Sequence, residues 1–307
     1  MQGKAKAWVL ASRPKTLPAA LIPVWIGFSL SWEIQILLIP ALLCLGFAVL
    51  IQIGTNFAND YYDFKSGADG KERKGPPRAV ASGWIAPSTM FKGTMLTFAA
   101  AFLMGLGLIP YGGWILLIVG VVSILCGLAY TGGPYPLGYN GLGDLFVFLF
   151  FGWVATLFTF YLQTGSFTIG LGISGFLRSF GLWLAGSVPG ALAVNLLIIN
   201  NLRDRDEDLL VGKKTLAVRF GRTFSLAQFI LLNTLSYTIP IMFFCGGYQL
   251  AILLPLICLP IGIWQTIRFV RARSVGDFNA SLALTALHLM LFGLLFGFGL
   301  ILGVPNP

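Results

Sequence analysis

Apolar segments long enough to cross a lipid bilayer recur from one end of this chain to the other. From Trp114 to Val122, nine consecutive residues carry no charge and no polar side chain apart from the indole. A helix needs about 20 such residues to span a hydrocarbon core of about 30 Å. Transmembrane β-barrels alternate polar and apolar residues, and these runs do not. With only 10% charged residues, against about 25% in soluble domains, the sequence predicts an all-α integral membrane protein.

We expect a bundle of about nine transmembrane helices around a central cavity. No run between the apolar segments is long enough for a separate soluble domain, so residues 1–307 are expected to form a single domain. The expected spans are residues 16–32, 39–57, 89–109, 114–130, 143–161, 180–199, 224–244, 249–267 and 280–302.

The basic residues predict the orientation of the bundle. The chain has 20 Lys and Arg against 11 Asp and Glu, and with nine spans all of the basic residues except Arg178 lie on, or just inside, one side. Loops rich in Lys and Arg stay in the cytoplasm, so we expect the N-terminus inside and the C-terminus outside a cell (inner) membrane. This placement also accounts for the net charge of +9 without a nucleic-acid partner.

Cysteine and histidine usage excludes several kinds of site. The only histidine, His288, lies in the last apolar segment, so Ser–His catalysis and a His-rich metal site are not expected, and we expect it to be packed or hydrogen-bonded. The four cysteines lie within apolar segments without paired spacing, which favours small core residues over disulfides or metal ligands. They are Cys44, Cys126, Cys245 and Cys258.

Two acidic stretches, 59–69 and 200–208, hold seven of the eleven carboxylates. Each follows an apolar segment on the expected cytoplasmic side, and the four spans between them would restore the same direction, as in a parallel duplication. Within each, residues four apart share one helical face. These are Asn59 with Asp63, and Asn200 with Asp204 and Asp208; Asp69 returns to that face only through a turn after Gly67, while Asp60, Asp206 and Glu207 are expected to be solvated bystanders.

Oxygen ligands of this kind suit Mg²⁺, which proteins commonly bind through a few carboxylates and the phosphates of a substrate. Cations in the same loops can hold phosphate oxygens, and the apolar segments offer a tunnel for a lipid tail. The uncharged loop 130–139 is either a bare turn or an aromatic wall. A cation-coupled transporter is the alternative from a different class, although its ionisable groups are expected nearer the midplane. The candidate phosphate-binding cations are Arg73, Lys74, Arg78, Lys213 and Lys214.

At these residues the chain resembles the UbiA superfamily of intramembrane prenyltransferases. The two aspartate-rich motifs match, as does the expected number of helices, and the nearest branch is that of the 1,4-dihydroxy-2-naphthoate polyprenyltransferases of menaquinone biosynthesis. In the third cytoplasmic loop Tyr135-Pro136 is followed by Leu137-Gly138-Tyr139 without a cation, which disfavours the 4-hydroxybenzoate branch. The last third of the chain carries no matching motif. The matching segments are 13–20 with Pro23 and Gly27, 56–83, 130–165 and 200–221.

The resemblance implies an enzyme that transfers a polyprenyl group from an isoprenyl diphosphate to 1,4-dihydroxy-2-naphthoate, with loss of CO₂ and diphosphate. Another aromatic acceptor, such as 4-hydroxybenzoate or homogentisate, is the alternative within the family. By resemblance, two Mg²⁺ ions bridge the diphosphate to the protein. The implied metal ligands are Asp63, Asp69, Asp204 and Asp208, of which Asp63 and Asp204 are the catalytic pair; the implied substrate contacts are Asn59, Asn200, Arg78, Lys213 and Lys214, with Arg13, Lys15, Tyr139 and Asp144 near the acceptor or the diphosphate.

Overall fold

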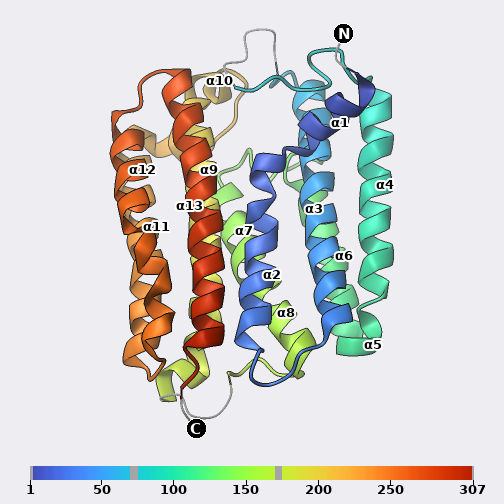
Figure 1. Cartoon of the computed structure of the whole chain (residues 1–307). Coiled ribbons are helices and arrows are strands. Elements are labelled where there is room, and N and C mark those ends of the chain that lie inside the picture. The colour runs from blue at the N-terminus through green and yellow to red at the C-terminus, as the bar shows by residue number, and fades with distance from the viewer. Residues whose placement is uncertain (1–2, 70–74, 170–174, 306–307) are drawn as a thin grey trace.

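The structure is a computed structural model that describes residues 3–69, 75–169 and 175–305. Helices running along a common direction form one bundle, and the described residues include no β-strand (Figure 1). The helices are α1 (Lys4–Ser12), η1 (Pro14–Thr16), α2 (Pro18–Leu30), α3 (Leu38–Lys65), α4 (Pro87–Leu106), α5 (Ile109–Gly112), α6 (Trp114–Ala129), α7 (Gly143–Phe148), η2 (Leu149–Val154), α8 (Ala155–Thr164), α9 (Gly175–Arg203), α10 (Arg205–Leu210), α11 (Leu216–Cys245), η3 (Leu250–Cys258), α12 (Leu259–Arg271) and α13 (Val275–Leu302).

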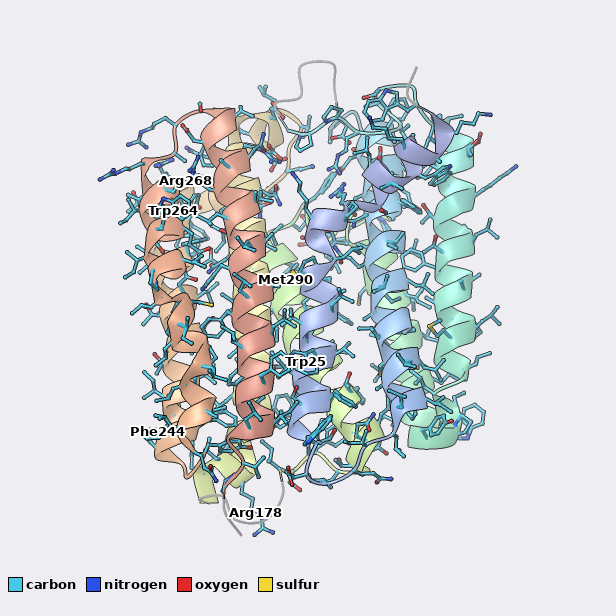
Figure 2. The ribbon with its side chains drawn as sticks, viewed as in Figure 1. Trp25, Arg178, Phe244, Trp264, Arg268 and Met290 are labelled. Atoms are coloured by element: carbon cyan, nitrogen blue, oxygen red, sulfur yellow. The ribbon has the colours of Figure 1, made fainter. Side chains whose placement is uncertain are left out.

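The expected apolar spans are all helical in the described part of the chain. Seven helices are long and apolar enough to cross a membrane, and Pro18–Leu30 and Trp114–Ala129 are shorter apolar helices. The N-terminus lies at the same end of the bundle as α1 and α10, and the C-terminus lies at the opposite end (Figure 1). Arg178 lies at the end opposite to Arg268 (Figure 2). The all-helical membrane fold is therefore confirmed, while nine crossings and the cytoplasmic orientation remain predictions.

Two helices extend beyond their expected ends. The apolar runs end near residues 57 and 199, but α3 continues to Lys65 and α9 continues to Arg203. Apolar runs mark only the hydrocarbon-sized part of a helix, whereas backbone hydrogen bonds continue through polar residues. As a result, Asn59 and Asp63 lie on the last two turns of α3 and not in a loop.

Helix α9 is the central element of the bundle. It packs against α2, α11, α13 and the π-helical turn η2. A Cβ atom at Gly152 of η2 would lie 2.7 Å from the carbonyl oxygen of Gly186, so the two backbones touch and only glycine fits. A π-helical turn changes which side chains face one direction. Beside this contact, Phe150 and Phe151 face a cavity on the other side of η2.

Candidate active site

A cavity of about 250 Å³ lies among α2, α3, α6, η2, α8 and α9. Most of its wall is apolar, and Cys44 and Cys126 belong to that wall. One end is polar, and Asn59 and Asn200, the first residues of the two motifs, lie on it. An apolar chamber with a polar end suits a ligand that has an apolar tail and a polar head. The other side chains at the polar end are those of Arg13, Thr16, Gln52, Thr55, Asn56 and Tyr130.

The first motif lies at the end of α3, beyond the polar end of the cavity. Asn59 accepts a hydrogen bond of 2.9 Å from the Thr131 hydroxyl. Asp63 follows one turn later and is only 3% exposed. Gly67 has a φ of +76°, a conformation that favours glycine, and it turns the chain so that the Asp69 amide donates to the Asp63 carbonyl at 3.2 Å. The turn that the sequence required for Asp69 is therefore present.

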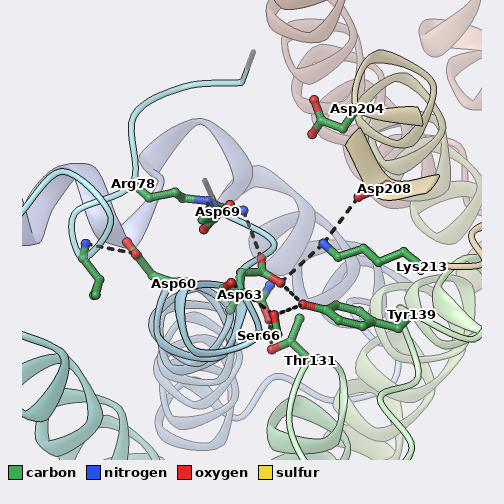
Figure 3. A network of polar contacts seen from close by, with 12 residues as sticks. Asp60, Asp63, Ser66, Asp69, Arg78, Thr131, Tyr139, Asp204, Asp208 and Lys213 are labelled. Carbon is green, nitrogen blue, oxygen red and sulfur yellow. Dashed lines mark hydrogen bonds and ion pairs between the residues drawn. The ribbon is translucent and has the colours of Figure 1, made fainter. Parts of the chain in front are cut away.

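Arg78 joins the two carboxylates of this motif. Its Nη2 lies 3.4 Å from Asp63 Oδ2, and its Nε lies 3.2 Å from Asp69 Oδ2. The Asp69 side chain is fully buried, and the Arg78 side chain is 13% exposed. The guanidinium therefore reaches the carboxylates from a segment about ten residues further along the chain, as expected for a cation of this site (Figure 3).

Asp60 is not the solvated residue that the sequence predicted. It is 2% exposed, and its two carboxylate oxygens accept hydrogen bonds from the backbone amides of Ala79 (3.0 Å) and Val80 (3.1 Å). This carboxylate anchors the segment that follows Arg78. Helix spacing correctly predicted that Asp60 does not share the face of Asn59 and Asp63. It could not show that Asp60 is buried, because the backbone that covers it begins 19 residues further along the sequence, at Ala79.

The second motif begins on α9 and continues across a short break into α10. Asp204 separates the two helices, with φ −93° and ψ 6°, yet the Asp204 amide donates to the Asn200 carbonyl and the Asp208 amide donates to the Asp204 carbonyl. The i to i+4 spacing is therefore preserved across the break. Asp204 forms an ion pair with Arg203, whose Nε lies 2.6 Å from Asp204 Oδ1.

Lys213 connects the two motifs. Its Nζ lies 3.4 Å from Asp63 Oδ1 and 3.4 Å from Asp208 Oδ1 (Figure 3). Asp63 and Asp208 are 145 residues apart in sequence, so a single ammonium group shows that the fold brings the two acidic stretches to the same place. Lys214 has an exposed side chain and uses its backbone amide to donate to the Tyr139 carbonyl at 2.6 Å.

Tyr139 provides an aromatic wall beside these charges. Its hydroxyl donates to Asp63 Oδ1 at 2.5 Å and also bonds Ser66 Oγ at 3.0 Å. The Lys213 ammonium lies 4.4 Å from the centre of the Tyr139 ring, within the range of a cation–π contact. The loop 130–139 therefore places an aromatic ring against the first motif, and a wall for a planar ligand stays a prediction.

Burial raises the pKa values of two side chains in this cluster. Burial raises the pKa of Asp208 to about 6, although the neighbouring Lys213 ammonium lowers it. The pKa of Tyr139 is also raised, chiefly by burial and then by the Asp63 charge. Perturbed pKa values at the polar end of a cavity are typical of functional sites.

Three other candidates, Arg13, Asp144 and Lys15, lie within the described residues. Arg13 is half-buried, lines the polar end of the cavity and has a φ of 51°, which is rare for a residue other than glycine. Asp144 is buried and accepts a hydrogen bond of 3.1 Å from Gln228 of α11. Lys15 is exposed. Arg73 and Lys74 lie outside the described residues.

The donor set fits a hard divalent cation. The candidate ligands are all carboxylate or amide oxygens, and Mg²⁺ is usually bound by one or two carboxylates together with phosphates and water. Across the described ranges, no three carboxylate, His or Cys side chains converge closely enough to hold a metal ion by themselves. The Lys213 ammonium stands between Asp63 and Asp208 instead, so the residues fit a metal ion that brings substrate oxygens with it better than a preformed protein cage.

Comparison with known proteins shows the family to which this chain belongs. The model of the UbiA prenyltransferase family matches residues 20–291. The chain is 37% identical to a 1,4-dihydroxy-2-naphthoate octaprenyltransferase of Escherichia coli, with 71% of this chain and 70% of that protein covered. It is 41% identical to the enzyme of the same name from Mycobacterium tuberculosis, with 70% of each covered.

A solved structure shares the fold. The chain resembles a UbiA homologue from Archaeoglobus fulgidus bound to DMAPP and Mg²⁺, with a TM-score of 0.59, 15% identity, and coverage of 97% of this chain and 99% of that one. At this identity the likeness concerns the fold alone. The family match covers most of the chain, and the chain belongs to the UbiA prenyltransferase family.

Proposed function

We propose that this protein transfers a polyprenyl group from an isoprenyl diphosphate to 1,4-dihydroxy-2-naphthoate, releasing CO₂ and diphosphate and giving demethylmenaquinone in its reduced, quinol form. The observation that carries this proposal is the meeting of two distant Asn-x-x-x-Asp motifs at one end of an apolar cavity, joined by Lys213. The relatives named 1,4-dihydroxy-2-naphthoate octaprenyltransferase, at 37% and 41% identity, support the choice of acceptor.

The residues at the polar end of the cavity would bind a metal–diphosphate head group, some through the metal ions and others through phosphate oxygens. We assign about two Mg²⁺ ions to the four aspartates, with Asn59 and Asn200 assisting from the wall of the cavity. When bound, Mg²⁺ neutralises charge on the departing diphosphate. Arg78 and Lys213 are held at Asp63 by ion pairs, from which each cation can turn to a phosphate oxygen. The four aspartates are Asp63, Asp69, Asp204 and Asp208.

The apolar chamber accounts for the rest of the reaction. Loss of diphosphate from an allylic substrate leaves a carbocation that water would destroy, and a dry wall prevents this side reaction. Phe146, Phe150 and Phe151 belong to that wall. The electron-rich naphthoate ring then forms a bond from its carboxyl-bearing carbon to the prenyl carbon, and the carbon–carboxyl bond breaks to release CO₂.

We place the polar end of the cavity at the cytoplasmic face of a cell (inner) membrane. Lys and Arg in the loops at that end support this orientation, because positively charged loops are retained in the cytoplasm. Diphosphate and Mg²⁺ would then enter from water, while the prenyl tail lies among the helices.

The test is an acceptor assay with purified protein in lipid nanodiscs. Protein, farnesyl diphosphate and Mg²⁺ are incubated with dihydroxynaphthoate, 4-hydroxybenzoate or homogentisate, and the products are identified by mass spectrometry. We expect prenylated, decarboxylated naphthoate only, abolished by EDTA and by Asp63→Ala in a protein that still folds. Prenylation of 4-hydroxybenzoate without turnover of dihydroxynaphthoate would overturn the choice of acceptor. Full activity of Asp63→Ala would overturn the site.

A further inference from the structure

The guanidinium of Arg203 is held between the second motif and the last helix of the chain. Arg203 ends α9, and its side chain is 4% exposed. Its Nε and Nη2 donate to the two oxygens of Asp204 at 2.6 and 2.8 Å, and its Nη1 donates to Asn279 Oδ1 at 2.8 Å. Asn279 lies in the second turn of α13, in the third of the chain that carries no family motif.

This arrangement is not a by-product of helix spacing. Adjacent residues on a helix do not face each other, and Arg203 reaches Asp204 because Asp204 leaves helical geometry between α9 and α10. An apolar contact fixes the two helix ends beside each other, since Leu202 and Phe278, the neighbours of Arg203 and Asn279, are buried in one cluster. Asn279 then accepts a hydrogen bond from Nη1, the remaining nitrogen of the guanidinium.

The contact with Arg203 does not by itself use the whole Asp204 carboxylate. Each carboxylate oxygen can accept about two hydrogen bonds or ligands, and the two-point contact with Arg203 takes one position on each oxygen. A planar guanidinium bound in this way fixes the plane of the carboxylate as well as its position. Groups that orient a metal-ligating carboxylate typically contribute 10- to 100-fold to metal affinity.

We propose that Arg203 and Asn279 are positioning residues for Asp204, so that α13 takes part in building the metal site. This inference rests on the proposed function, in which Asp204 binds Mg²⁺. It predicts that changing Asn279, which is exposed, does not line the cavity and accepts a hydrogen bond from Arg203, weakens metal binding through Arg203.

The test measures Mn²⁺ affinity of the full-length protein in nanodiscs by electron paramagnetic resonance, with a non-reactive thiolo analogue of an isoprenyl diphosphate present to supply the phosphate oxygens. We expect Arg203→Ala to weaken Mn²⁺ binding by about 10- to 100-fold, Asn279→Ala to weaken it several-fold, and Arg203→Lys to restore part of the loss. The control is Asp277→Asn, which lies two residues away in the first turn of α13 and accepts hydrogen bonds from the backbone amides of Arg273 and Ser274 instead of contacting Arg203. It should leave Mn²⁺ affinity unchanged.

The reference variant Asp204→Asn separates this inference from the proposed function. If Asp204→Asn weakens Mn²⁺ binding while Arg203→Ala and Asn279→Ala bind normally, the positioning role is overturned and the metal site stands. If Asp204→Asn itself binds Mn²⁺ normally, both are overturned. Tighter binding by Arg203→Ala would also overturn the inference, because the guanidinium would then compete with the metal. Asn279→Ala keeps the test decisive if Arg203→Ala does not fold.

Discussion

Asp60→Asn is the substitution that most sharply separates a structural carboxylate from its catalytic neighbours. Asp60 accepts backbone hydrogen bonds from Ala79 and Val80 and is almost fully buried. Asparagine keeps one acceptor oxygen, and its NH₂ group would face a backbone N–H, leaving one buried donor without a partner. Hydrogen bonds to charged groups contribute about 1.5–3 kcal/mol each. We therefore expect the free energy of unfolding to fall by about 2–3 kcal/mol.

We also expect Asp60→Asn to change the kinetic constants of the reaction. The segment held by Asp60 follows Arg78 directly, so its displacement moves the guanidinium and should raise KM for the isoprenyl diphosphate more than it lowers kcat. The assays are chemical unfolding in mixed micelles and steady-state kinetics. Asp206→Asn, at an exposed position, is the matched control for the charge change and should stay within about 0.5 kcal/mol. Unfolding of Asp60→Asn at the wild-type free energy would refute the reasoning.

Three further predictions concern other parts of the chain. Lys213→Gln should reduce turnover by 100-fold or more, because the Lys213 ammonium joins the two motifs. Lys214→Gln changes an exposed side chain and should keep turnover near the wild-type value. Equal losses of turnover in the two variants would contradict this prediction. Tyr237→Phe removes the hydroxyl of a half-buried residue that bonds His288 Nε2 at 2.7 Å, and unfolding measurements should show a loss of about 1–3 kcal/mol with normal activity. A drop in turnover would argue against a purely structural role. Burial raises the pKa of Asp208 to about 6, so its stabilising contribution is present below the unfolded pKa of about 4 and is lost as pH rises through 6. Protein in EDTA should therefore be about 1 kcal/mol less stable at pH 7 than at pH 5. Unfolding measurements that show higher stability at pH 7 than at pH 5 would contradict this prediction.

The sequence predicted those parts of the site that depend on local spacing. Asn59 and Asp63 share a face of α3 because they are four residues apart, and Gly67 permits the turn that brings Asp69 back. The helical class and the approximate spans followed from the length of the apolar runs. His288 was expected to be packed or hydrogen-bonded, and it bonds Tyr237 within the bundle.

Contacts between distant segments could not be predicted from one sequence. Lys213 and Lys214 are adjacent and identical, and backbone geometry distinguishes them. Gly212 has a positive φ, the Lys213 amide donates to the Asp208 carbonyl, and the Lys214 amide donates to the Tyr139 carbonyl. Asp60 was misjudged because its partners are backbone amides, which leave no signal in side-chain patterns. Arg203 and Asn279 are 76 positions apart, and Asn279 lies in a part of the chain where the sequence carries no recognisable motif.

The most direct test of the central claim is a structure of this protein in nanodiscs with Mn²⁺ and a non-reactive thiolo analogue of an isoprenyl diphosphate. We predict metal density between the two motifs, with ligands from both Asp63 and Asp208, the diphosphate beside Lys213, and the tail in the apolar cavity. Metal and diphosphate bound to one motif alone, or at another place on the bundle, would contradict a single active site built from both acidic stretches.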